Sequence, residues 1–416
     1  MNKNYYDIII IGSGIAGLYS AYLILKNSPS SNILILEKYK KKWVGGRWGN
    51  ELFHGSTIVT GAGIGRKNKD KLLIQLLHEI HVPYKEEKFE VNYYLDHPMD
   101  IKKIITYLKK EYKKYKKRPN MTFEQFGKQH LGNEVYNNFI KTVGYTDYEK
   151  EDIEEVLYNY GMEDNFEKST ILSIPWKEAV NKLVSKIGIE HFAFSSNVEK
   201  INKIRDSPCI FQVLLENDFI YYCNKVIIAT TIESITKLVP KSCDVWSLYK
   251  QIHGQPFLRL YGKFSKQSIP ILKKSIRGYT IVDGPLQKII PINEDKGIYM
   301  ISYSDNKNAL YLKKYTENTE KNRQILCTLL EKSLGIPTNS LTLLDIKSFY
   351  WDIGTHYYSP LSNEFKNRKE YLGKIQHPEN GMLVVGEAVS DDQGWSEGAL
   401  RSVERVLTKN WIKSLC

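Results

Sequence analysis

The feature that most constrains this chain is a glycine-rich turn near its start. Residues 6–11 read Tyr6-Asp7 followed by four isoleucines in succession, which predict a buried strand. The turn follows at once as Gly12-Ser13-Gly14-Ile15-Ala16-Gly17. Its first glycine permits a sharp reversal, its second the close approach of a pyrophosphate, and its third close packing of helix on strand. A helix beginning near Gly14 would point its free N–H groups at phosphates.

A second apolar strand, residues 33–36, ends in Glu37, which lies 20 residues beyond Gly17. An acidic side chain at this spacing accepts hydrogen bonds from the ribose hydroxyls of a dinucleotide. The alternative is a glycine-rich turn that binds no ligand. The strand before the turn and the acid after it favour a dinucleotide-binding unit.

The composition indicates a soluble protein of two domains. A chain of 416 residues with 42% hydrophobic residues is too long for one core of ordinary size. The longest aliphatic run, residues 8–11, is far shorter than the roughly 20 residues of a membrane span, and no signal peptide is evident. The five cysteines are widely spaced, which indicates neither a disulfide framework nor a metal site and suits a cytoplasmic location.

The formal net charge of +12 raises the question of nucleic acid or an anionic membrane as a partner. The strongest basic run, residues 102–118, alternates lysines with apolar residues at helical spacing. This pattern favours a solvated helix face over a nucleic-acid patch, and we expect no nucleic-acid partner.

The dinucleotide signals recur in three separated blocks. Residues 1–85, 171–245 and 353–416 are predicted to form one discontinuous domain, which includes a helix from Trp176, a hairpin over 211–222 and buried strands at 226–230 and 382–385. Residues 86–170 predict helices, and residues 246–352 predict strands with one helix around 317–334. We therefore expect an α/β fold, a Rossmann-like domain interleaved with a mixed α+β domain, and a ligand where the two meet.

Two further motifs carry a resemblance to a known family. They are Gly45-Gly46-Arg47, and Gly386-Glu387 followed by Gly394-Trp395-Ser396-Glu397-Gly398-Ala399. With the opening unit, they resemble the motifs of the flavin-containing amine oxidases in the same order along the chain. The resemblance implies an FAD-binding domain and a substrate-binding domain.

The resemblance also implies roles for individual residues. Glu37 would hold the ADP half of FAD, Arg47 would reach the pyrophosphate and flavin edge, Glu387 would bind the ribityl chain, and the main chain of Val198 would pair with adenine. The alternatives are a surface salt bridge for Arg47 and an N-cap or surface acid for Glu387. The full set of implied cofactor-binding residues is Gly12, Ser13, Gly14, Ile15, Ala16, Gly17, Glu37, Lys38, Gly45, Gly46, Arg47, Gly61, Ala62, Val198, Gly386, Glu387, Trp395, Ser396 and Ala399.

On the substrate side, members of this family flank the substrate nitrogen with two aromatic rings. Trp395 falls at one of these positions, and alignment on Gly354 places His356 at the other, with Tyr357 or Tyr358 available if the register shifts. These rings could also be ordinary core aromatics.

Two positions depart from the family pattern. Arg259 stands where many members keep a lysine that contacts flavin N5 through water; it would hold a water molecule or a substrate carboxylate there. Strand alternation places it on one face with Phe257 and Tyr261. Thr355 stands where monoamine oxidases carry the flavin-linking cysteine, so FAD is expected to bind non-covalently.

The activity that the resemblance implies is FAD-dependent oxidation of a small-molecule amine, with dioxygen as the second substrate. Arg259, Trp395, His356 and Tyr357 are the candidate catalytic residues. Two alternatives stay open: a related FAD desaturase of the carotenoid or protoporphyrinogen type, and a flavin-bearing binding protein without turnover.

Overall fold

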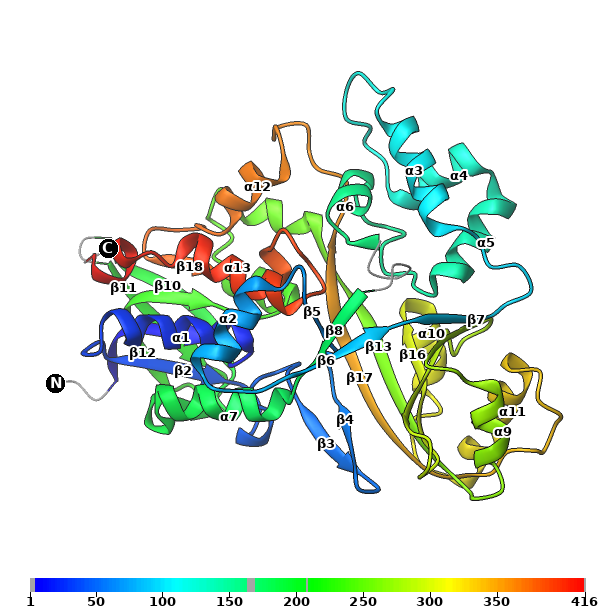
Figure 1. Cartoon of the computed structure of the whole chain (residues 1–416). Helices are drawn as coiled ribbons and strands as arrows, with labels where there is room; N and C mark the ends of the chain where they lie inside the picture. The colour runs from blue at the N-terminus through cyan, green and yellow to red at the C-terminus, as the bar shows by residue number, and fades with distance from the viewer. Residues whose placement is uncertain (1–3, 163–168, 207–208, 415–416) are drawn as a thin grey trace.

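Two large β-sheets organise the molecule (Figure 1). The computed structural model describes residues 4–162, 169–206 and 209–414. The first sheet contains the N-terminal strand, and its other strands come from three later stretches of the chain. The fold is therefore an interleaved α/β arrangement, as predicted.

The first sheet has the strand order β10-β11-β12-β1-β2-β9, and β18 pairs with β12. Its strands are β1 (Tyr5–Ile11), β2 (Ile33–Glu37), β9 (Phe192–Phe194), β10 (Val198–Asp206), β11 (Cys209–Leu215), β12 (Ile220–Ile228) and β18 (Met382–Val384). Strand β1 runs parallel to both of its neighbours, β12 and β2. The predicted hairpin is confirmed, because β11 and β12 pair in antiparallel fashion.

Alternation along β1 explains why four successive isoleucines are buried. Ile8 and Ile10 point to one core cluster, and Ile9 and Ile11 point to another on the opposite face. A parallel sheet covered on both faces has such continuous apolar strands. The first cluster is completed by α1 (Ile15–Asn27), α2 (Lys71–Glu79), α7 (Trp176–Ile187), α13 (Ser396–Val406) and α14 (Lys409–Lys413), and the second by α8 (Ile232–Leu238) and α12 (Arg368–Ile375).

The second sheet has the order β17-β13-β16-β15-β14-β7. Its strands are β7 (Val91–Tyr94), β13 (Ile252–Phe264), β14 (Tyr279–Val282), β15 (Lys288–Asn293), β16 (Ile298–Asp305) and β17 (Leu343–Tyr358). Its apolar residues pack with those of α9 (Ile269–Ser275), α10 (Asn306–Lys313) and α11 (Glu320–Ser333). The long pair β13 and β17 forms the edge of this sheet that lies nearer to the first sheet (Figure 1).

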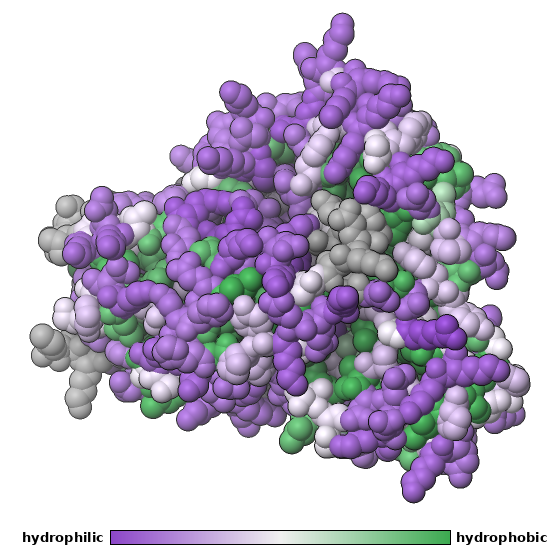
Figure 2. Space-filling model, in the orientation of Figure 1, coloured by the Kyte–Doolittle hydropathy of each residue, from purple (hydrophilic) through white to green (hydrophobic). Residues whose placement is uncertain are grey.

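Four helices form a separate apolar cluster beside the second sheet: α3 (Ile101–Tyr112), α4 (Phe123–Leu131), α5 (Asn133–Val143) and α6 (Ile153–Tyr158). Helix α3 buries Ile101, Ile105 and Leu108. Its lysines Lys102 and Lys103 are exposed, and hydrophilic residues cover this end of the molecule in Figure 2. The predicted solvated face is confirmed, but the helix ends at Tyr112 and does not continue to 118.

Two predictions of secondary structure are wrong in part. Strands β6 (Lys85–Phe89) and β7 lie at the start of the segment 86–170, where helices were expected. Strand β6 joins β5 (Gly65–Arg66) and β8 (Ser169–Ser173) in a small sheet. Three helices, α9 to α11, interrupt the segment expected to hold one. Helices α9 and α10 have 7 and 8 residues, too few for the periodicity that a window of 11 or more residues detects. The last small sheet pairs β3 (Asn50–Phe53) with β4 (Ser56–Val59).

Among the described residues, no helix is both long and apolar enough to cross a membrane.

Candidate functional site

A large cavity lies where the two sheets meet. Its volume is about 1550 Å³, above the 300–1,000 Å³ usual for a drug-sized ligand. Turns of the first sheet line it around Gly14, Gly46 and Gly386, and strands of the second sheet line it through Arg259 and Tyr303. The space therefore suits a dinucleotide together with a second molecule.

The glycine turn is built as its spacing predicts. Gly12 has a φ of +101°, and a Cβ there would lie 2.5 Å from the carbonyl oxygen of Ala229. A Cβ on Gly17 would collide with the carbonyl oxygen of Gly12. Gly14, at the N-cap of α1, has no atom within 4 Å of the position of a Cβ and lines the cavity. Two glycines thus serve the packing of the βα unit, and Gly14 leaves open a space at the start of the helix.

Glu37, at the end of the neighbouring strand β2, accepts hydrogen bonds from the glycine turn. Its Oε2 accepts hydrogen bonds from the backbone N–H of Ser13 at 2.9 Å and from the Ser13 hydroxyl at 2.6 Å. Its Oε1 accepts from the N–H of Tyr39 at 2.9 Å, and Glu37 lines the cavity. The Ser13 hydroxyl thus bonds to Glu37, and Ser13 does not line the cavity, contrary to its expected contact with the cofactor.

Glu387 is the centre of a buried polar network. One oxygen accepts from the N–H groups of His356 and Gly394 at 2.9 and 2.8 Å. The other contacts Nδ1 of His356 at 2.6 Å and accepts from both terminal nitrogens of Arg47 at 3.2 Å. Burial alone would raise the pKa of this carboxyl, but His356, Arg47 and the Gly394 N–H outweigh it and lower the pKa to about 2.

This network bears on two expectations. Protein donors already satisfy both oxygens of Glu387, so no sugar hydroxyl is needed to compensate its burial. Arg47 donates to the buried Glu387 and to the carbonyl oxygen of Gly354, so it does not form the surface salt bridge that was the alternative, and its contact with a pyrophosphate stays a prediction. Both residues line the cavity, and both shape the wall there.

Of the three residues considered for the second aromatic position, His356 and Tyr358 line the cavity and Tyr357 does not. The Nε2 atom of His356 accepts the N–H of Ile232 at 3.2 Å, so the ring is held between Ile232 and Glu387, with 3% of the residue exposed. Tyr357 stacks on His253, with 5.1 Å between ring centroids. Alternation along β17 turns Tyr357 to the face opposite His356 and Tyr358, so the aromatic position next to a substrate stays a prediction for those two residues.

Trp395 is placed by the turn that precedes α13. It is the N-cap of that helix and lines the cavity with Ser396 and Ala399. The guanidinium carbon of Arg66 lies 3.9 Å from the centroid of its ring. Arg66 is itself fixed by Asp70 and Asp392, at 2.6 and 2.7 Å. The indole is therefore supported on one face by a buried, paired cation.

Arg259 reaches the cavity from β13, as the strand alternation predicts. Its Nε donates to the carbonyl oxygen of Gly61 at 2.8 Å, and its guanidinium lies 4.0 Å from the centroid of the Tyr303 ring. Arg259 is 6% exposed and forms no ion pair with a carboxylate of the described residues. Phe257 lines the cavity beside it, whereas Tyr261 donates to the carbonyl oxygen of Val59.

Sequence reasoning missed a group of aromatic and acidic residues on the substrate-domain side of the cavity. They are Tyr145, Asp147, Glu151, Glu155, Tyr160, Tyr279 and Tyr303. Tyr145 and Tyr279 share a hydrogen bond of 2.8 Å between their hydroxyls, although 134 residues separate them. No spacing in the sequence indicates such contacts, because they arise only when β14 and β16 join one sheet and the segment after α5 lies against it.

Most of the other expected cofactor-binding residues line the cavity: Gly12, Gly14, Ile15, Ala16, Lys38, Gly45, Gly46, Gly61, Ala62, Val198 and Gly386. Gly17 lies behind the turn, where the packing of α1 on β1 requires it. Thr355 lines the cavity, and its hydroxyl accepts from Nε2 of Gln255 at 3.2 Å.

Comparisons with known proteins agree with this architecture. A family model described as an NAD(P)-binding Rossmann-like domain matches residues 10–80. No curated protein sequence matches the chain. Three solved mutants of putrescine oxidase, from a structure-based redesign of its cofactor binding, are similar in structure.

The first of these, a single mutant, has 13% sequence identity and a TM-score of 0.72, over 96% of this chain and 97% of that one. The triple mutant has 14% identity and a TM-score of 0.71, with 96% and 97% covered. The double mutant has 14% identity and a TM-score of 0.69, with 96% and 98% covered. The chain therefore contains an NAD(P)-binding Rossmann-like domain and has the overall fold of putrescine oxidase.

Proposed function

We propose that this protein is an FAD-dependent oxidase of small-molecule amines. The observation that carries the proposal is that one cavity connects the glycine turn at Gly14 with Trp395 and Arg259. The fold shared with putrescine oxidase, an amine-oxidising enzyme by its name, supports the same assignment.

The residues at the glycine turn fit a dinucleotide. The space beside Gly14 is one that a Cβ would fill, and it opens at the N-terminus of α1, whose N–H groups favour phosphate. Glu37 lines the same space at the end of β2. We propose that FAD binds there non-covalently, since Thr355 offers no thiol at the position where monoamine oxidases are linked to flavin.

When bound, FAD would accept a hydride from the carbon that bears the amine and pass the electrons to dioxygen, giving an imine and hydrogen peroxide. The protein orients the substrate. Trp395, backed by Arg66, offers an aromatic wall, and the rings of Tyr145 and Tyr303 offer others. The fixed positive charge of Arg259 disfavours a protonated amine beside it, so it favours the neutral form that can lose a hydride.

The lining distinguishes this proposal from the desaturase alternative. A polyene or porphyrinogen needs a long apolar cavity, whereas this cavity presents Arg259, Asp147 and Glu151 on the substrate-domain side. Buried charges of this kind are costly unless a polar ligand pairs with them. A small polar amine suits such a wall better.

Anaerobic mixing of the purified flavoprotein with a panel of amines, polyamines and amino acids tests the proposal. At least one amine should bleach the flavin absorbance, and Trp395→Ala should slow bleaching more than it lowers flavin content. Trp246→Ala is the matched control, because Trp246 lies outside the cavity and donates to the carbonyl oxygen of Thr236. If no amine reduces the flavin but a polyene or porphyrinogen does, the desaturase assignment replaces this one.

A further inference from the structure

Helix α3 and the residues that follow it hold most of the net charge of the protein. Residues 101–118 contain eight lysines, one arginine and one acid, Glu111, which gives this segment a net charge of +8. The whole chain has a net charge of +12, so the rest of the chain shares only +4. A lysine-rich composition would spread positive charge along the chain and does not explain this concentration. We call residues 101–118 the basic segment.

The structure exposes this charge at one end of the molecule. Helix α3 packs its apolar face into the four-helix cluster, and hydrophilic side chains cover the outside of that cluster (Figures 1 and 2). Within the basic segment, Lys114 pairs with Glu111 at 2.7 Å. Five other exposed lysines form no ion pair with a carboxylate of the described residues: Lys103, Lys110, Lys113, Lys116 and Lys117.

Two exposed tyrosines lie among these lysines. Tyr107 and Tyr115 are 40% and 37% exposed. A tyrosine combines an apolar ring with a polar hydroxyl, and it is enriched where lipid headgroups meet water. Lysine is a point charge on a flexible stem, so it contacts a phosphate without the fixed geometry of arginine. Lysines interspersed with exposed tyrosines therefore fit the headgroups of an anionic bilayer.

A small surface hollow opens at the end of the basic segment. Its volume is about 380 Å³, and four cations line it, Lys116, Lys117, Arg118 and Lys366, together with one acid, Glu154. The three lysines are exposed. The hollow therefore gathers positive charge around a space that is open to a headgroup phosphate.

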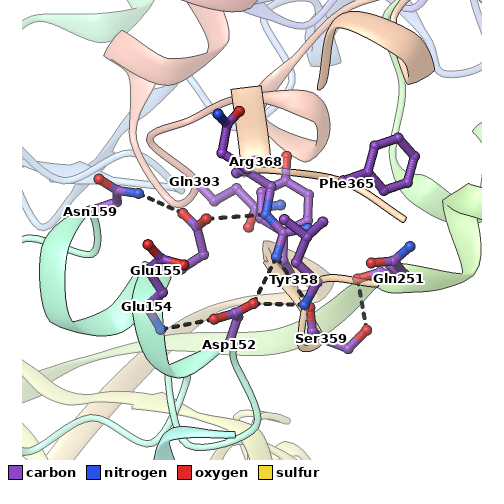
Figure 3. A network of polar contacts seen from close by, with 12 residues as sticks. Asp152, Glu154, Glu155, Asn159, Gln251, Tyr358, Ser359, Phe365, Arg368 and Gln393 are labelled. Atoms are coloured by element: carbon purple, nitrogen blue, oxygen red, sulfur yellow. Dashed lines mark hydrogen bonds and ion pairs between the residues drawn. The ribbon is translucent and has the colours of Figure 1, made fainter. Parts of the chain in front are cut away.

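Hydrogen bonds fix the walls of this hollow. A terminal nitrogen of Arg118 donates to the carbonyl oxygens of residues 361, 362 and 365, each at 3.2 Å. Arg368, at the start of α12, donates from Nε to Glu155 at 3.1 Å and from a terminal nitrogen to Asp152 at 3.3 Å (Figure 3). The segment before α12 is thus tied both to the basic segment and to α6, so the hollow is preformed.

We propose that the basic segment binds the protein to the surface of an anionic lipid bilayer, with Lys116, Lys117 and Lys366 around a headgroup phosphate. Clusters of lysines on a helix are attracted to acidic lipids in this way. Nucleic acids fit less well, because arginine forks read base edges and the one arginine of the segment, Arg118, donates to carbonyl oxygens of its own chain. The proposal does not depend on amine oxidation, since no residue of the basic segment lines the large cavity.

Co-sedimentation with lipid vesicles tests this proposal. The protein is mixed with vesicles of phosphatidylcholine alone, or with about 30% phosphatidylserine added as the acidic lipid. We expect binding to the acidic vesicles only. Raising NaCl from about 0.1 M to about 1 M should release the protein, because the Debye length falls from about 10 Å to about 3 Å. Lys110→Gln, Lys113→Gln and Lys117→Gln combined should lower the partition coefficient roughly 100-fold, or about fivefold for each lysine.

Lys182→Gln and Lys186→Gln on α7, combined with Lys321→Gln on α11, form the matched control. This variant loses the same charge from exposed lysines outside the basic segment, so it should keep its binding to acidic vesicles. Both triple variants should melt at the temperature of the unchanged protein, because all six side chains are exposed.

Two results would overturn the proposal: no binding of the unchanged protein to acidic vesicles, or an equal loss of binding in both triple variants, which would show that only the net charge matters. Binding to polyuridylic acid without binding to acidic vesicles, lost in the first triple variant, would assign the basic segment to nucleic acid instead.

Discussion

At the scale of single residues, a charged side chain in this cavity serves either the protein or the ligand, and its partners show which. Glu387 accepts from His356, Gly394 and Arg47, so its charge is used within the protein. Arg259 and Glu151 form no ion pair with a residue in the described ranges. Residue type alone did not separate these cases, because all three are charged residues that line the same cavity.

Glu387→Gln should destabilise the protein at neutral pH. The folded-state pKa of about 2 is lower than the ordinary value of 4.5, so Glu387 contributes stability above pH 4.5 that is lost as the pH falls through about 2. A shift of this size corresponds to about 3 kcal/mol at pH 7. Urea unfolding of both proteins at pH 7 and pH 3 should show the difference shrinking at the lower pH.

Glu51→Gln is the control for that measurement. Glu51 forms an exposed ion pair with Lys347, and its side chain is 40% exposed, so its loss should change stability by less than about 1 kcal/mol. A difference between Glu387→Gln and the unchanged protein that is independent of pH would show that the network does not depend on the charge of Glu387.

Arg259→Met should affect the reduction of the flavin by substrate and its reoxidation by dioxygen to different extents. If the unpaired guanidinium binds a substrate carboxylate, as we expect, KM for amino acids should rise about 10–100-fold, the effect of losing a charge-assisted hydrogen bond, while simple amines are spared. Slower reoxidation by dioxygen with intact anaerobic reduction would assign Arg259 to a bound water instead. Steady-state and stopped-flow kinetics separate the two, with Arg323→Met, on α11, as control.

At the scale of elements, local chemistry predicts those units whose contacts are close in sequence. The order of β1, glycine turn, α1 and β2 could be predicted because Gly17 and Glu37 each meet a residue of the glycine turn within that unit. Short or charged elements such as β6 and α9 could not be predicted, because their secondary structure depends on pairing and packing with segments that are distant in the sequence. The same reason hid the tyrosines and carboxylates on the substrate-domain side of the cavity, which come together only through β14, β16 and the segment before α6.

Gly14→Ala should separate folding from cofactor binding. Its φ of −65° and ψ of 174° suit alanine, and a Cβ meets no atom within 4 Å, so the apoprotein should lose no more than about 1 kcal/mol of stability, the N-cap cost. The same methyl would occupy the approach of the pyrophosphate, so FAD affinity should fall at least about tenfold. Gly17→Ala, in contrast, should prevent folding, since its Cβ collides with the backbone of Gly12. Thermal melts measure the stability of each variant, and fluorescence titration measures its affinity for FAD. Unchanged FAD affinity in Gly14→Ala would show that this turn does not contact the cofactor.

At the scale of the whole molecule, residues of both sheets line one cavity. Its lining comes from the first turn of the chain, from β13 and β17, and from the turns before α13. The interleaved α/β class was predictable from the order of the motifs. The domain boundaries proposed from the sequence stay predictions, because β13 and β17 extend between the two regions (Figure 1).

FAD should therefore stabilise the molecule as a whole. At 100 times its dissociation constant, a ligand adds about 2.7 kcal/mol, which for a chain of this length raises Tm by about 3 °C. Calorimetry should show a single unfolding transition that moves upward with FAD. Two transitions, of which FAD moves only one, would show that the sheets unfold independently.

The position of β18 has a consequence for how the protein folds during its synthesis. This strand, residues 382–384, pairs with β12, and the Gly386 and Trp395 turns that follow it close the cavity. Until β18 has been synthesised, the C-terminal half of β12 is an unpaired strand edge that other nascent chains can pair with. The cavity proposed to bind the cofactor is also incomplete until then. If the cavity binds the proposed cofactor, we therefore expect binding only after β18 and the turns that follow it have been synthesised.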